Sequence, residues 1–100
     1  MTGANGSPAY DVIFSSLQLQ RIVELHDEAL KRGLGEEFLA VLKVVQEQLR
    51  TAPATFGDPL YRLPAAKLIV YVRAIFPIVI DYGVHQEKPV VFIRSIALMR

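Results

Sequence analysis

The stretch KLIVYVRAIFPIVIDYGVHQEKPVVFIRSIALM (residues 67–99) predicts three consecutive β-strands and decides the fold class. β-Branched and aromatic residues, which favour strands, fill residues 67–75, 78–84 and 90–99. A tight break at Phe76-Pro77 and a polar turn at residues 85–89 separate them. Because such short connections join neighbouring antiparallel strands, we predict an antiparallel meander.

A first amphipathic helix is predicted well upstream of this meander. Ser15 has the spacing of an N-cap, with Gln18 three residues later. Lys31 and Arg32 suit the negative end of a helix, and Gly33 suits the left-handed position after it. Apolar residues recur at steps of three and four along one expected face: Leu19, Ile22, Val23, His26, Ala29 and Leu30.

A second helix is predicted to start at Gly35 and to end near residues 50–52, because Pro53 cannot continue it. Its apolar stripe consists of Phe38, Val41, Leu42, Val45 and Leu49. Two helices joined by about two residues must pack antiparallel, as a helical hairpin.

The remaining segments complete a single domain over residues 10–100. Residues 1–9 are expected to form a disordered tail, and alternation in residues 10–15 predicts a strand. Residues 53–59 are expected to form a loop, followed by a short extended segment at residues 60–64. The expected fold is α+β, with the order β-α-α-β-β-β and the helical hairpin packed on a twisted antiparallel sheet.

Composition limits the classes of function that fit this chain of 100 residues. Hydrophobic residues make up 52% and charged residues 21%, so apolar surface either fills a compact core or meets a partner. No apolar run approaches the roughly 18 residues of a membrane span, and no signal peptide is visible, so a cytoplasmic protein is expected. The net charge of +1 offers little excess of Lys and Arg for general nucleic-acid binding.

Strong motifs for metal, cofactor or phosphate binding are missing from the sequence, so we expect no metal and no cofactor. The two histidines, His26 and His85, lie 59 positions apart. They are interpreted as a residue at the edge of the core and a turn residue.

A cationic sheet face is the main candidate for chemistry. Alternation puts Lys67, Tyr71 and Arg73 on one face of the first long strand. Arg94 is expected on the same side, together with Phe92 and Ile96, with Asp81 on the strand between. Such a face would bind a phosphate backbone and polarise a scissile phosphate. The alternative is that Arg73 or Arg94 pairs with Asp81 across the strands, which is worth about 0.2–1 kcal/mol.

The order of elements and three segments, DPLYRL (58–63), LIVYVRAIFPIVIDYGV (68–84) and VVFIRSIALM (90–99), resemble the RelE/ParE toxins of type II toxin–antitoxin systems. Arg62 and Leu63 match a basic-apolar step in the family's loop, and Arg73 and Tyr82 match its hairpin arginine and tyrosine. The family's turn Gly-Asp is Phe76-Pro77 here, its next hairpin arginine falls at about Val79, and its final His-Arg pair falls near Ala97-Leu98.

The resemblance implies a ribosome-dependent mRNA endoribonuclease with a degenerate active site. It assigns catalysis to Arg73, Arg94, Tyr71 and Tyr82, and substrate binding to Arg62 and Lys67. It implies an antitoxin peptide or protein as partner, with the ribosome and mRNA, or DNA gyrase, as target. A non-catalytic, ParE-like binding protein is the alternative on the same fold, and a structural domain unrelated to toxins is the third reading. Homodimer formation stays open.

Overall fold

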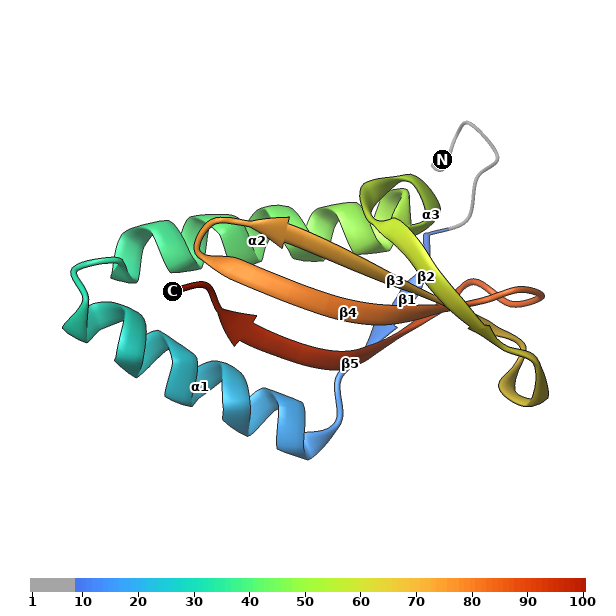
Figure 1. Cartoon of the computed structure of the whole chain (residues 1–100), viewed down its shortest axis with the longest axis horizontal. Coiled ribbons are helices and arrows are strands. Elements are labelled where there is room, and N and C mark those ends of the chain that lie inside the picture. Colours follow the sequence, from blue (N-terminus) through green and yellow to red (C-terminus); the bar gives the residue numbers. More distant parts are fainter. Residues whose placement is uncertain (1–8) are drawn as a thin grey trace.

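The computed structural model describes residues 9–100, so the expected tail, apart from Ala9, lies outside the described residues. The chain forms an α+β domain in which helices pack on a mixed five-stranded sheet (Figure 1). Its elements are β1 (Asp11–Ile13), α1 (Ser16–Lys31), α2 (Gly35–Thr51), α3 (Pro53–Phe56), β2 (Asp58–Leu63), the 3-10 helix η1 (Pro64–Ala66), β3 (Leu68–Ile75), β4 (Ile78–His85) and β5 (Val90–Leu98).

The two long helices form the expected hairpin, and local signals fix their ends. The Ser15 hydroxyl accepts a hydrogen bond from the Gln18 amide at 3.1 Å, which caps α1. Gly33 has a φ of 73° and turns the chain between the helices. α1 and α2 then run antiparallel along the sheet (Figure 1).

The sheet has the strand order β1-β5-β4-β3-β2. The meander β3-β4-β5 is antiparallel, as predicted, but β1 pairs with β5 in parallel, so the prediction of a wholly antiparallel sheet is wrong. The reason is that β1 and β5 are far apart in the chain, and no short connection dictates their relative direction. β1 covers only the first residues of β5, from Val90 to Phe92.

The segment between α2 and β3 also differs from the prediction. Residues 53–56 of the expected loop form the short helix α3, and Asp58–Leu63 forms a fifth strand at the edge of the sheet. β2 contains Pro59 and a register shift between Pro59 and Tyr61. Such a strand is hard to recognise from sequence because proline and a bulge interrupt its alternation.

The core lies between the helical hairpin and one face of the sheet. Phe38 and Leu49 of α2 and Tyr82 of β4 are fully buried there. No α-helix within residues 9–100 covers the opposite face, and we call it the bare face. Residues directly opposite each other on paired strands share a face, so the row Tyr61, Val70, Gly83 and Phe92 lies on the bare face. None of the helices in residues 9–100 is both long and apolar enough to cross a membrane.

Candidate functional site

The two tyrosines assigned to catalysis lie on the helix-facing side of the sheet. Tyr71 and Tyr82 are directly opposite each other on β3 and β4, and their rings stack with centroids 5.5 Å apart. Tyr71 is 8% exposed and Tyr82 is 0% exposed. Both side chains are therefore part of the core and are closed to a substrate.

The Tyr82 hydroxyl is also held by a hydrogen bond. It donates to the Pro53 carbonyl oxygen of α3 at 2.7 Å. Burial raises the pKa of Tyr82 far above its ordinary value, because the phenolate cannot be solvated there. A general base must lose its proton near neutral pH, so Tyr82 is placed to hold α3 against the sheet.

Arg73 points to the same side as these tyrosines. It lies opposite Ile80, a core residue, and its guanidinium sits 5.2 Å from the centre of the Phe56 ring. This is a cation–π contact at the end of the helix-covered layer.

Arg94 lies on the other side of the sheet, on the same face as Phe92 two residues before it, and a β-bulge follows there. Between Tyr82–Ile93 and Asp81–Ser95 the register shifts by one residue, and Arg94 is the extra residue. Its Nη2 lies 3.4 Å from the Tyr61 hydroxyl, which belongs to the bare-face row. Past the bulge, Ile96 returns to the helix-facing core opposite Ile80.

Two sequence predictions are therefore wrong. Arg94 and Ile96 do not share a face, because the bulge changes the alternation between them. Arg73 and Arg94 lie on opposite faces of the sheet, so they form no single cationic surface. The pairing with Asp81 is absent as well, since none of the four ion pairs within residues 9–100 includes it.

The two residues assigned to substrate binding do not share one strand face with Arg94. Arg62, on the edge strand β2, is exposed and is opposite Ile69, which belongs to the helix-facing side. Lys67 precedes β3 in a left-handed conformation, with a φ of 56°, and does not follow the strand alternation. Its Nζ pairs with the Glu87 carboxylate at 3.1 Å.

A hollow of about 690 Å³ opens on the bare face beside Arg94. Leu68 and Phe92 supply apolar walls, and His85 supplies a polar one. The His85 Nδ1 accepts hydrogen bonds from the amides of Glu87 and Lys88, each at 3.1 Å, so the neutral ring carries its proton on Nε2. His85 holds the turn, as predicted, and also lines this hollow because it ends β4 on the bare face.

A second candidate surface lies on the outside of the helical hairpin. Of the predicted apolar face of α1, Ala29 is buried, whereas Leu19, Val23 and Leu30 are 53%, 63% and 56% exposed. Leu25, which was not predicted to lie on that face, is buried instead. We call these three exposed residues the outer stripe. They lie on one side of the helix because they are separated by four and seven positions.

His26 lies between the outer stripe and the second helix. Its ring stacks on Phe38 with centroids 5.9 Å apart, which confirms the interpretation of His26 as a residue at the edge of the core. Leu39 of α2 is 50% exposed and adds a further apolar side chain to the outside of the hairpin.

No cluster within residues 9–100 has enough His, Cys, Asp or Glu side chains together to hold a metal ion. Comparison with protein-family models, with curated proteins and with solved structures found no match. The geometry alone therefore has to support any assignment of function.

Proposed function

We propose that the chain is a toxin-like protein that acts by binding a protein target without cleaving RNA, and that an antitoxin polypeptide binds and silences it. The outer stripe is the observation that supports this function best. Its three apolar side chains are each more than half exposed on one helix. Exposed apolar side chains on one side of a helix are typical of a site that a partner covers.

The arrangement of the sheet argues against the ribonuclease reading in its original form. The arginines assigned to charge stabilisation, Arg73 and Arg94, lie on opposite faces. Tyr82, assigned to proton transfer, is buried and bonded to Pro53. Transition-state stabilisation needs donors that converge on one reacting atom, and these residues do not converge.

The test is to induce expression of the chain in bacteria and to measure growth, with Val23→Glu as the central variant. We expect the unaltered chain to slow growth and Val23→Glu to lose that effect, because a carboxylate in the outer stripe must be desolvated when a partner covers it. Gln20→Glu is the matched control, since it adds the same charge to an exposed position of the same helix. Unchanged growth with the unaltered chain, or equal effects of both variants, would contradict the proposal.

RNA binding on the bare face is the second candidate, and the hollow beside Arg94 favours it. Arg94 and the Nε2–H of His85 are hydrogen-bond donors suited to a phosphate, and Phe92 offers a ring for stacking with a base. In this tautomer His85 donates a hydrogen bond and cannot accept a proton at Nε2. The bare face therefore suits binding of RNA better than its cleavage.

Measuring the binding of a short single-stranded RNA to the purified chain distinguishes the second candidate function from the first. If RNA binds in the hollow, Arg94→Ala weakens binding by about tenfold, as expected for the loss of a charged contact to phosphate. Arg73→Ala is the matched control on the opposite face. Equal loss in both variants, or no binding by the unaltered chain, would reject the hollow as an RNA site.

A further inference from the structure

A hollow of about 300 Å³ with mostly polar walls opens where α1 passes the end of β5. Arg21, Leu25 and Glu28 line its α1 side, and Arg32 continues the row just past the helix end. Spacings of four, three and four residues place these side chains on one face of a helix. Arg100, which follows β5, lines the other side. This hollow shares no lining residue with the outer stripe or with the hollow on the bare face.

Arg32 is held in place from two sides. Its Nη1 donates to the Met99 carbonyl oxygen at 2.8 Å, and its Nη2 donates to the Glu28 carboxylate at 2.9 Å. These bonds tie the end of α1 to the end of β5 and fix the plane of the guanidinium group. Since a guanidinium group has five N–H donors, the others stay available to a ligand in the hollow.

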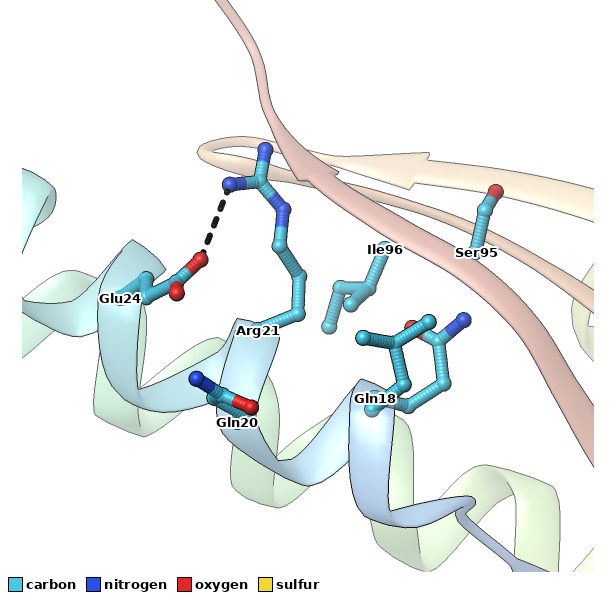
Figure 2. A pocket seen from close by; sticks show the side chains of 7 residues that line it. Gln18, Gln20, Arg21, Glu24, Ser95 and Ile96 are labelled. Atoms are coloured by element: carbon cyan, nitrogen blue, oxygen red, sulfur yellow. Dashed lines mark ion pairs between the residues drawn. The ribbon is translucent and has the colours of Figure 1, made fainter.

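Arg21 lines both this hollow and a neighbouring one of about 350 Å³. Figure 2 shows the neighbouring hollow, with the Arg21 side chain extending from α1 toward β5. Its Nη1 lies 3.6 Å from the Glu24 carboxylate, which is too long for a hydrogen bond, and both side chains are about half exposed. An exposed pair of this kind contributes little to stability, so Arg21 can turn toward a ligand at low cost.

The charges that line the hollow do not cancel. Three guanidinium groups and the one carboxylate of Glu28 leave an excess of two positive charges among the lining residues. In the part of the chain that the structure describes, no ion pair includes Arg100. The negative end of the α1 dipole, equivalent to about half a charge, is smaller than this excess. The hollow therefore attracts an anion, and a dianion matches its charge.

We propose that this hollow binds a phosphate dianion, either free or at the end of a small molecule, between Arg21, Arg32 and Arg100. The planar fork of an arginine matches two oxygens of a phosphate group. A phosphate monoester carries a charge of about −1.5 to −2 at pH 7, whereas a diester or a carboxylate carries only one negative charge. At roughly 30 Å³ per water molecule, the hollow has room for a phosphate and a small organic group beside it.

Isothermal titration calorimetry of the purified chain at low salt tests the proposal. We expect inorganic phosphate or glycerol 3-phosphate to bind with a dissociation constant of about 1 mM or tighter. Whichever of the two binds more tightly identifies the source of the phosphate group. Dimethyl phosphate, a singly charged diester, should bind at least about tenfold more weakly. No binding of either dianion, or equal binding of dimethyl phosphate, would overturn the proposal.

Charge variants locate the site. We expect Arg21→Gln and Arg100→Gln each to weaken binding by about tenfold, because each removes a charged donor. Glu28→Gln should strengthen binding, since it removes the carboxylate that competes for Arg32. Arg50→Gln is the matched control, because it removes the same charge from an exposed position of α2. All four positions are exposed, so the fold survives these changes.

Two outcomes of the variant series would overturn the site. One is equal weakening by all three arginine variants, which would mean that the anion responds only to the net charge of the chain. The other is unchanged affinity in both Arg21→Gln and Arg100→Gln, which would place the anion elsewhere.

Discussion

Tyr82 links the sheet to α3 through a buried hydroxyl, and its contribution to stability can be measured. Tyr82→Phe removes the donor at 2.7 Å from the Pro53 oxygen and leaves that buried acceptor without a partner. We expect a loss of about 1–3 kcal/mol in the free energy of unfolding, measured with urea. Tyr61→Phe, on the exposed side of the sheet, is the control and should cost less.

The same residue predicts how stability depends on pH. Burial raises the pKa of Tyr82 in the folded chain above the value of about 10 for an unfolded tyrosine. The stabilisation is complete below about pH 10 and is lost above it, because the unfolded chain releases this proton first. Urea unfolding should show a steeper loss above about pH 10 for the unaltered chain than for Tyr82→Phe. Parallel curves would contradict the assignment.

Gly57 and Gly83 both lie where an added Cβ would come close to a neighbouring residue, and the two positions can be compared. A Cβ on Gly57 would lie 2.8 Å from the Val72 backbone oxygen and 2.7 Å from the Tyr82 hydroxyl. A Cβ on Gly83 would lie 3.1 Å from the Leu68 Cδ1, which can move. We expect Gly57→Ala to cost about 1–3 kcal/mol and Gly83→Ala clearly less, by urea unfolding. A larger loss of stability for Gly83→Ala than for Gly57→Ala would contradict the close packing of Gly57 against Val72 and Tyr82.

At the scale of elements, the start of α1 depends on one side chain. Ser15 caps the helix through its contact with the Gln18 amide. Ser15→Ala should reduce the free energy of unfolding by about 1 kcal/mol, whereas Ser16→Ala, already inside the helix, should have little effect. Equal effects in thermal unfolding would mean that the cap does not hold α1.

The sequence predicts the elements better than it predicts how they combine. Hydrophobic periodicity locates both helices and the strands β3, β4 and β5, because each period depends on neighbouring residues alone. The parallel pairing of β1 with β5 depends on contacts between distant residues. The bulge at Arg94 adds one residue to the strand without any change in composition. The alternation in the sequence therefore does not reveal it, although the side chains that follow the bulge point to the opposite face from the one that alternation predicts.

The register between strands explains why the candidate site was only partly predictable. Arg94 was expected beside Arg73, but it shares the face of Phe92, which is opposite Gly83, and so it lies beside Tyr61 instead. Tyr61 and His85 joined the bare-face set only once the register of β2, β3 and β4 was known. The alternation of His85 with Gly83 is visible in the sequence, but nothing there indicates which face the helices cover.

At the scale of the whole molecule, the two faces of the sheet and the outside of the hairpin have different chemistry. Core aromatic rings and Arg73 meet the helices, donors at Arg94 and His85 surround a hollow on the bare face, and the outer stripe exposes apolar side chains. With a net charge of +1, the chain has little general attraction for nucleic acids. We therefore prefer the proposed binding of a protein partner through the hairpin to general binding of RNA.

The most direct measurement is the mapping of mRNA 5′ ends in bacteria after expression of the chain is induced. We predict slowed growth with intact mRNA, because the residues assigned to catalysis lie on opposite faces or inside the core. New 5′ ends that appear with the unaltered chain and disappear with Arg94→Ala would contradict this prediction.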